Sequence, residues 1–172
     1  MARPSSRGLA GYFPTPSRLL PNIASTLSWP SPLAIPRSSV IFDPCAGDGE
    51  AIRTLRDLWT PKGERDPTAG RPRILACELE GERHATLEAS LERPLFHHSS
   101  LLIDRAFRGD AFRLHLPADE LGFASVVYLN PPYDVDFLER RGAESPNRLE
   151  HRFLERFTPY VSPLGGVLMY LV

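Results

Sequence analysis

Residues 40–50 read Val40-Ile41-Phe42-Asp43-Pro44-Cys45-Ala46-Gly47-Asp48-Gly49-Glu50, which is the pattern of a strand, a glycine-containing turn and the start of a helix. This stretch starts as a short apolar run, typical of a buried strand, and continues into a turn that contains glycines. The apolar residues that follow share one face of a predicted helix: Ala51, Ile52, Leu55, Leu58 and Trp59. In this arrangement a ligand can lie at the helix N-terminus, where glycine allows close approach to the backbone. Asp43 and Asp48 would repel a pyrophosphate but favour an ammonium group and sugar hydroxyls.

A second predicted strand, Ile74-Leu75-Ala76-Cys77, ends at Glu78. An acid at the tip of the second strand of a βαβ unit is placed to accept hydrogen bonds from both hydroxyls of a ribose. Glu78 lies farther from the glycine turn than the roughly 20 residues usual for this position, and a Pro- and Gly-containing loop at 60–73 accounts for the difference. The alternative interpretation is a solvated acid at a strand end.

The third predicted strand is weakly marked, and Ala106-Phe107-Arg108 is the best candidate. A helix over 82–93 is expected before it. Asp110 follows a glycine at the end of this strand, where its carboxylate could bind an exocyclic amine. An ordinary Asx-turn is the alternative interpretation.

A fourth predicted strand, 125–129, leads into Asn130-Pro131-Pro132-Tyr133. Successive prolines cannot continue a strand ladder, so they form a stiff loop at the edge where open α/β sheets bind ligands. The Asn130 amide and the Pro131 carbonyl can accept hydrogen bonds from an amino group, and the Tyr133 ring can stack on a flat heterocycle. The alternative is a rigid strand-to-helix turn capped by Asn130.

The N-terminal part of the chain is rich in proline and arginine. Residues 1–39 are expected to form an arm, a short helix over 17–27 and a Pro-rich connector, with Thr15 or Ser17 capping the helix. Residues 40–172 are expected to form the main core.

Beyond the prolines, residues 134–147 are polar and include Arg140 and Arg141. They form either a solvated loop or a lid that touches substrate phosphates. A helix over 149–157 and an apolar strand over 167–172 follow. The alternation of strands and helices along the whole chain predicts an α/β fold with a doubly wound, mostly parallel sheet.

The composition of the chain limits the classes of function that it can have. The chain has 172 residues, of which 42% are hydrophobic and 24% charged, as in an ordinary globular domain. No apolar run approaches the roughly 18 residues of a membrane span. The net charge of −1 gives no overall basic field for nucleic acid, although a local patch would suffice. Cys45 and Cys77 are too few for a disulfide framework, which favours the cytoplasm, and the five histidines lack metal-ligand spacing, so no metal site is predicted.

Together these motifs resemble the class I S-adenosylmethionine-dependent methyltransferases, and specifically the gamma-type N6-adenine DNA methyltransferases. Residues 43–49 are similar to the first motif of that family, and Asn130-Pro131-Pro132-Tyr133 is similar to its fourth. Gly11-Tyr12-Phe13-Pro14-Thr15-Pro16 is similar to the N-terminal arm of the gamma subgroup, which folds back over the methionine part of the cofactor. The resemblance covers roughly residues 10–172 and implies a Rossmann-like fold.

The resemblance also implies a function. The cofactor would be S-adenosyl-L-methionine, and the substrate would be DNA, methylated on the exocyclic N6 amine of adenine as in restriction-modification systems. The implied catalytic residues are Asn130, Pro131, Pro132 and Tyr133. The implied cofactor-binding residues are Tyr12, Thr15, Pro16, Asp43, Cys45, Ala46, Gly47, Gly49, Glu78, Asp110 and Ala111.

The chain departs from the family pattern at its end, because that fold carries further strands after the one ending at Val172 and the gamma enzymes add a target-recognition domain. We therefore expect a C-terminal continuation or a partner chain to complete the sheet, since an apolar edge strand invites pairing. The alternative functions are methylation of an RNA base or a protein glutamine amide, and a non-catalytic methyltransferase-fold binding module. The arm favours DNA, and the intact acids and Asn130 argue against the binding module.

Overall fold

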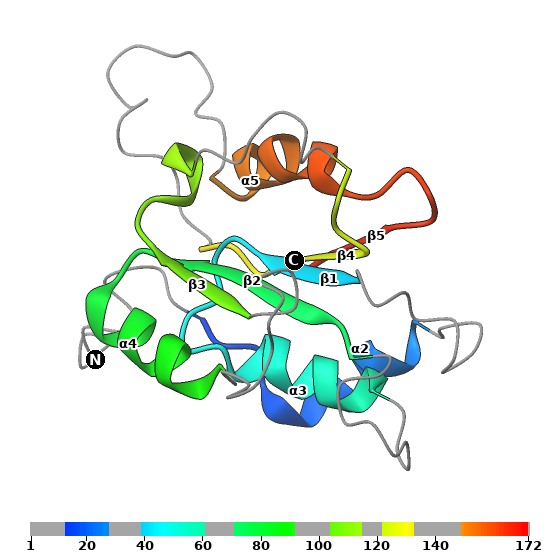
Figure 1. Cartoon of the computed structure of the whole chain (residues 1–172), viewed down its shortest axis with the longest axis horizontal. Helices are drawn as coiled ribbons and strands as arrows, with labels where there is room; N and C mark the ends of the chain where they lie inside the picture. Colours follow the sequence, from blue (N-terminus) through cyan, green and yellow to red (C-terminus); the bar gives the residue numbers. More distant parts are fainter. Residues whose placement is uncertain are drawn as a thin grey trace, which may run out of the picture.

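The computed structural model describes residues 13–27, 39–60, 71–91, 104–114, 122–132 and 149–171. Within them a five-stranded sheet is formed by β1 (Val40–Asp43), β2 (Arg73–Glu78), β3 (Arg105–Arg108), β4 (Val126–Leu129) and β5 (Val167–Tyr170). The strand order is β3-β2-β1-β4-β5, and all these pairings are parallel (Figure 1). The predicted doubly wound parallel sheet is confirmed.

The direction of winding changes between β1 and β4. From β1 the chain moves outward to β2 and β3, then returns to the other side of β1 for β4 and β5. Asp43 is the last residue of β1, and Asn130 directly follows β4. Both therefore stand at the switch point, where open α/β sheets bind their ligands.

Helices cover both faces of the sheet (Figure 1). One face carries α2 (Leu20–Ser25), α3 (Glu50–Trp59) and α4 (Gly81–Ser90), and the other carries α5 (Leu149–Phe157). Short 3₁₀ helices are η1 (Ser17–Leu19), η4 (Ala111–Arg113) and η7 (Thr158–Tyr160). In the described ranges, no helix combines the length and apolar character needed to cross a bilayer.

The beginning of the chain differs from the prediction. Neither Thr15 nor Ser17 caps the first helix, since Pro16 is the N-cap of η1 and makes no side-chain capping bond. Thr15 instead hydrogen-bonds to Tyr128 of β4. The first helices also pack into the core, because Leu20 is fully buried against the α3 side of the sheet.

The buried face of α3 also differs from the prediction. Leu58 was expected on it but is 46% exposed, whereas Arg56 is buried. Arg56 can be buried on this face of α3 because its guanidinium has a buried partner, the carboxylate of Asp104. The helix predicted over 82–93 is α4, which runs over Gly81–Ser90 and therefore ends earlier than predicted, with Leu91 as its C-cap.

The two sides of the core alternate along β1, because successive strand residues point to opposite faces. Ile41 belongs to the cluster under α2, α3 and α4, together with Ile52, Leu55 and Leu87. Phe42 belongs to the cluster under α5, where ring centroids lie 5.7 Å away in Phe157 and 5.8 Å away in Tyr160.

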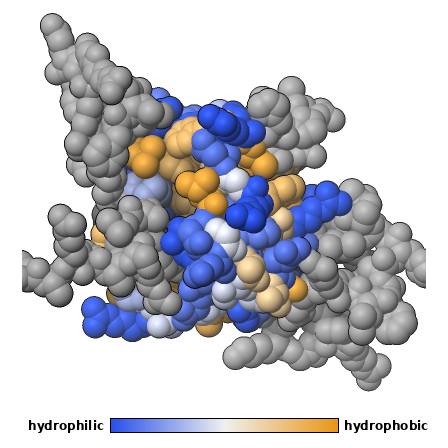
Figure 2. Space-filling view, turned by 90° about the vertical axis from the view of Figure 1, so that its left-hand side faces the viewer, coloured by the Kyte–Doolittle hydropathy of each residue, from blue (hydrophilic) through white to orange (hydrophobic). Residues whose placement is uncertain are grey.

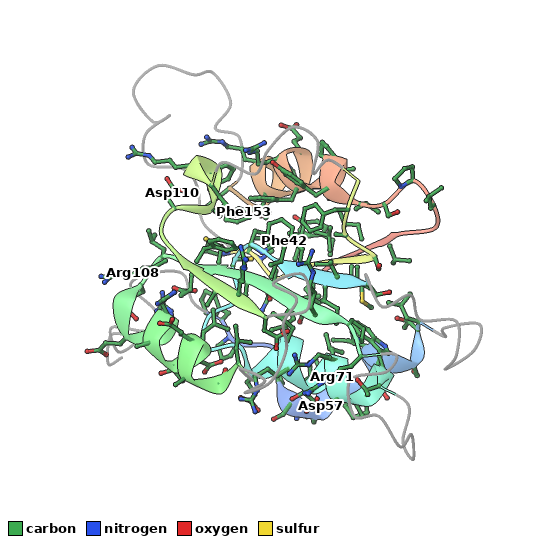
Figure 3. All side chains as sticks on the ribbon, viewed as in Figure 1. Phe42, Asp57, Arg71, Arg108, Asp110 and Phe153 are labelled. Atoms are coloured by element: carbon green, nitrogen blue, oxygen red, sulfur yellow. The ribbon has the colours of Figure 1, made fainter. Side chains whose placement is uncertain are left out.

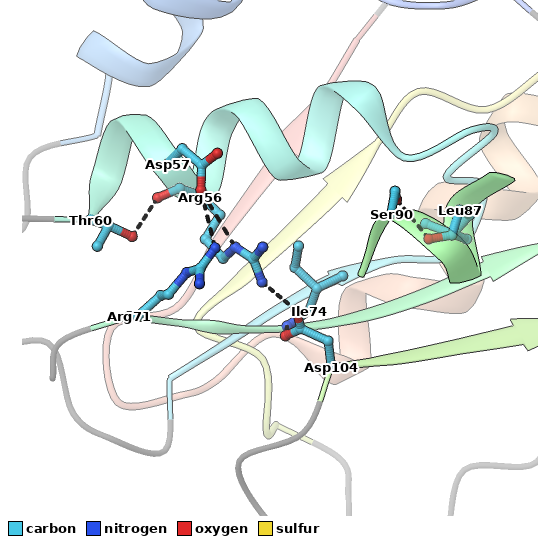
Figure 4. A network of polar contacts seen from close by, with 8 residues as sticks. All are labelled: Arg56, Asp57, Thr60, Arg71, Ile74, Leu87, Ser90 and Asp104. Carbon is cyan, nitrogen blue, oxygen red and sulfur yellow. Dashed lines mark hydrogen bonds and ion pairs between the residues drawn. The ribbon is translucent and has the colours of Figure 1, made fainter. Parts of the chain in front are cut away.

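A buried polar network ties α3 to the N-terminal ends of β2 and β3 (Figure 4). The Asp104 carboxylate accepts hydrogen bonds from the Arg56 guanidinium and, at 2.8 Å, from the backbone N–H of Ile74. The side chains of Arg56 and Asp104 are only 3% and 7% exposed, so water screens this ion pair poorly. A neighbouring pair between Arg71 and Asp57, at 3.4 Å, is more exposed.

Candidate functional site

A cleft of about 500 Å³ opens at the C-terminal ends of the strands. Its walls come from the segment before η1, the turns after β1 and β2, η4, the residues after β4, and α5. Figure 2 looks onto this side of the molecule and shows hydrophobic residues set among hydrophilic ones. A mainly apolar cleft with a few polar groups is typical of small-molecule sites.

Asp43 lines this cleft, although it is only 2% exposed. Its Oδ1 accepts a hydrogen bond from the backbone N–H of Cys45 at 3.0 Å. Burial raises the pKa of the Asp43 carboxyl to about 7; the hydrogen bond from Cys45 opposes this rise, and the nearby Glu78 carboxylate adds to it. A cation bound beside Asp43 would favour its ionised form.

This raised pKa predicts how stability depends on pH. The pKa of the Asp43 carboxyl is 3.8 in its ordinary environment and about 7 in the folded protein. Between these two pH values the carboxyl is protonated in the folded state and ionised in the unfolded state. The free energy of unfolding therefore falls as the pH rises from about 4 to about 7. Asp43→Asn is expected to remove this loss. The variant should be roughly 4 kcal/mol more stable than the wild type above pH 7, and equally stable near pH 4. Urea unfolding across this range measures the difference, and parallel pH profiles would contradict it.

The thiols of Cys45 and Cys77 are protonated at neutral pH. Burial raises the pKa of the Cys45 thiol well above its ordinary value and that of Cys77 to about 12. Because the thiolate is the reactive form, these residues serve as small packing groups rather than nucleophiles.

Glu78 is held firmly at the end of β2, where it is 6% exposed. Its Oε2 accepts a hydrogen bond from the Gly47 backbone N–H at 2.9 Å, and its Oε1 accepts one from the Glu80 N–H at 2.9 Å. The Arg83 guanidinium also binds Oε1, at 3.0 Å through Nε and 2.8 Å through Nη2. Within the described residues, Oε2 therefore has more acceptor capacity left for a ligand than Oε1.

Gly49 has a packing role. It precedes α3 with φ of 82°, a conformation that favours glycine. A Cβ at this position would lie 2.5 Å from Cδ1 of Leu87 in α4. The glycine therefore permits close contact between the turn and α4, which is independent of any ligand.

Asp110 lies at the open side of the cleft, above the end of β3 (Figure 3). Its Oδ1 accepts a hydrogen bond from the Phe112 backbone N–H at 2.9 Å, which caps η4. This is the Asx-turn geometry considered from the sequence. The same residue lines the cleft, so the binding of an exocyclic amine by Asp110 stays a prediction beside the observed Asx-turn.

The segment before η1 contacts the loop after β4. The Asn130 side-chain Nδ2 donates hydrogen bonds to the Phe13 carbonyl at 2.8 Å and to the Thr15 hydroxyl at 3.1 Å. The Thr15 hydroxyl also lies 2.6 Å from the Tyr128 hydroxyl. Phe13, Thr15, Tyr128 and Asn130 all line the cleft.

An aromatic wall closes the α5 side of the cleft. The Phe112 and Phe153 rings lie 4.7 Å apart between centroids, and the Arg152 guanidinium lies 5.0 Å from the Phe112 centroid. All of these residues line the cleft. Such a wall offers flat apolar surface to a ring.

The structure brings together most of the residues predicted for the site. Those lining the cleft are Thr15, Asp43, Cys45, Ala46, Glu78, Asp110, Ala111, Asn130 and Pro132. Gly47 reaches it through its bond to Glu78, whereas Pro16, Gly49 and Pro131 are not part of its lining. Tyr12, Tyr133 and the segment 134–147 lie outside the described residues.

Several cleft residues were missed from the sequence. Among them are Phe13, Leu79, Arg83, Phe112, Tyr128, Arg152 and Phe153. Leu79 and Arg83 follow Glu78 closely, and their position after a strand end was the available indication. The aromatic wall and Tyr128 depend on contacts between distant segments. No group of described His, Cys, Asp or Glu residues is arranged to hold a metal ion.

The fold is similar to those of known methyltransferases. A protein from Listeria monocytogenes, described as a class I S-adenosylmethionine-dependent methyltransferase, matches with a TM-score of 0.62 and 17% identity over 92% of this chain and 46% of its own. The methyltransferase subunit of a type I restriction-modification system from Streptococcus thermophilus matches with a TM-score of 0.59 and 15% identity over 91% of this chain and 33% of its own.

The chain thus spans less than half the length of these two proteins. No protein-family model and no curated protein matches it in sequence. The similarity in three dimensions, together with the parallel sheet and its switch-point cleft, shows that the chain has the Rossmann-like fold of class I methyltransferases.

Proposed function

We propose that the chain binds S-adenosyl-L-methionine in this cleft and promotes methyl transfer to the exocyclic N6 amine of adenine in DNA. The observation that carries this proposal is the meeting of Asn130 with Asp43 and Glu78 in one cleft at the switch point. The carboxylates of Asp43 and Glu78 suit a cationic nucleoside, and the amide of Asn130 suits an amine that must react with that nucleoside.

The acids would hold the cofactor. The Glu78 carboxylate, fixed by Gly47, Glu80 and Arg83, is placed to accept from ribose hydroxyls. Asp43 would favour the positively charged methionine part through its carboxylate. Asp110 and the aromatic wall would contact the adenine ring. S-adenosylmethionine supplies an already activated sulfonium methyl group. The chain therefore has to position this group against the acceptor and to stabilise the transition state.

Asn130 would prepare the acceptor. An adenine amine is a poor nucleophile because its lone pair is delocalised into the ring. By accepting an N–H bond with its amide oxygen, together with the Pro131 carbonyl, Asn130 would favour a tetrahedral nitrogen with an exposed lone pair. Acceptors fixed where positive charge develops stabilise the transition state. We propose that Tyr133 stacks on the flipped base, a contact worth roughly 1–3 kcal/mol.

Two observations favour DNA over other acceptors. The Streptococcus thermophilus neighbour is a restriction-modification subunit, and its structure covers most of this chain. The segment that includes Phe13 and Thr15 contacts Asn130, as a gamma-type arm over the active site would.

The test is transfer of labelled methyl from S-adenosylmethionine to unmethylated DNA, RNA and protein extract in parallel, followed by nucleoside analysis of the product. The proposal expects label in DNA, recovered as N6-methyladenine. Label recovered in protein glutamine or only in RNA would move the activity to that acceptor. Cofactor binding by calorimetry without transfer to any acceptor would instead indicate a binding module.

Cofactor affinity should depend on Glu78. Glu78→Ala is expected to weaken S-adenosylmethionine binding by roughly 1–3 kcal/mol, or about 5- to 150-fold, because hydrogen bonds to a carboxylate are charge-assisted. Calorimetry measures the affinity, and circular dichroism checks that the variant is folded. Glu82→Ala is the matched control, because Glu82 is exposed on α4 and should leave affinity unchanged. Equal affinities of a folded Glu78→Ala variant and the control would exclude the proposed role of Glu78.

A further inference from the structure

We propose that Thr15 and Tyr128 are positioning residues for Asn130, an inference that rests on the proposed function. Together with the Phe13 carbonyl they would hold the Asn130 amide in one orientation, with its oxygen turned toward the cleft. Neither hydroxyl needs to touch the reacting atoms for this role.

The orientation of the Asn130 amide follows from donor and acceptor chemistry. The atom of this amide that lies 2.8 Å from the Phe13 carbonyl must be Nδ2, because a carbonyl oxygen can only accept a hydrogen bond. A second bond runs from Nδ2 to the Thr15 hydroxyl at 3.1 Å. With both amide hydrogens directed to the N-terminal segment, Oδ1 points to the opposite side. Methyl transfer requires this arrangement, since the substrate amine needs an acceptor.

The Thr15 hydroxyl is itself held by a hydrogen bond with the Tyr128 hydroxyl. Thr15 is 7% exposed, and its Oγ1 lies 2.6 Å from the hydroxyl of Tyr128, which is 1% exposed in β4. The Tyr128 ring packs in the core cluster that contains Ile41 and Ile52. Tyr128 in the sheet thus fixes the Thr15 hydroxyl, and this hydroxyl accepts a hydrogen bond from the Asn130 amide.

Strand geometry explains why one segment reaches both residues. Tyr128 is two positions before Asn130, so side chains at these positions point to the same face of an extended chain. The N-terminal segment crosses this face, and Thr15 contacts both side chains there. Leu129, which lies between these two residues, points to the opposite face and packs on the α5 side.

Variants that remove only a hydroxyl test the inference. Thr15→Val is expected to lower kcat about tenfold, the kinetic equivalent of one hydrogen bond, with the KM for S-adenosylmethionine changed by less than about threefold. Tyr128→Phe is expected to lower kcat by a smaller factor, and Thr15→Ser should restore the wild-type rate. A change in KM alone, or a Thr15→Ser variant as slow as Thr15→Val, would overturn the inference.

A double-mutant cycle separates positioning from general packing. In an Asn130→Ala background the amide is absent, so Thr15→Val should cause no further loss of rate. An equal loss of rate in both backgrounds would show that Thr15 acts independently of Asn130, and would overturn the inference.

A measurement without substrate keeps the inference distinct from the proposed function. In the ¹⁵N-labelled chain, the Asn130 side-chain amide hydrogens are expected to exchange slowly with solvent, and Thr15→Val should accelerate their exchange by about tenfold. If the wild type methylates no acceptor, the proposed function fails, and this exchange still reports the orientation. Unchanged exchange in Thr15→Val would overturn the inference, whatever the activity.

Discussion

Asn130→Ala is expected to lower the rate of methyl transfer about 10²–10³-fold, the usual cost of losing one preorganised transition-state group. S-adenosylmethionine affinity should change by less than about twofold, because the interaction is made with the acceptor rather than with the cofactor. The acids proposed to bind the cofactor are Asp43 and Glu78 at the ends of β1 and β2 and Asp110 after β3, whereas Asn130 follows β4. Labelled methyl transfer and calorimetry on the same preparation separate the two quantities.

Asn22→Ala is a suitable control for this experiment, because Asn22 is an exposed asparagine of α2. It should leave both rate and affinity unchanged. If Asn130→Ala lost cofactor affinity in proportion to rate, Asn130 would belong to the cofactor site. If it kept the full rate, the proposed chemistry at this residue would be wrong.

Asp104→Ala is expected to destabilise the fold by about 3–5 kcal/mol, the usual cost of leaving one member of a buried ion pair without its partner. The substitution removes the buried partner of the Arg56 guanidinium, which keeps only its contact of 3.9 Å with the exposed Asp57, and it removes the acceptor of the Ile74 N–H. Urea unfolding of the variant and the wild type measures this difference. Activity should be lost only through unfolding, since the network lies at the opposite end of the sheet from the cleft.

The neighbouring pair supplies the control. Asp57→Ala breaks the contact with Arg71 at 3.4 Å and the longer one with Arg56 at 3.9 Å, and because the Asp57 side chain is 60% exposed it should cost at most about 1 kcal/mol. The double variant Arg56→Met, Asp104→Leu removes both buried charges and should recover part of the lost stability. A double variant less stable than Asp104→Ala would show that the network stabilises in some way other than charge pairing.

Sequence alone predicted the parallel sheet because β1, β2, β4 and β5 each carry an apolar run and are separated by turns with glycine or proline, whereas β3 (Arg105–Arg108) was only weakly marked. It also predicted Asp43, Glu78 and Asn130 as neighbours, since residues that follow parallel strands meet at one edge. These inferences need only local patterns and one rule of topology.

The remaining features depend on contacts between distant segments. Nothing in the local pattern around Arg56 distinguishes a buried arginine from an exposed one, because its partner Asp104 lies beyond β2 and α4 in the chain. The glycine turn predicted ligand contact, yet Gly49 is constrained by Leu87 of α4. The link from Thr15 to Tyr128 was missed for the same reason. Periodicity gives the direction of a side chain but does not identify its partner.

The pairing of β1 with β4 has a consequence for folding kinetics. Strand β1 can pair with β2 after closing a loop that contains only α3 and its neighbours, but its pairing with β4 must close a loop that also includes β2, α4 and β3. Contact between Thr15 and Tyr128 closes a longer loop still. Since long loops cost more entropy and slow folding, we expect β1, β2 and β3 to associate first. The acceptor side of the cleft would then be completed late, once β4 has entered the sheet and the N-terminal segment has docked on it.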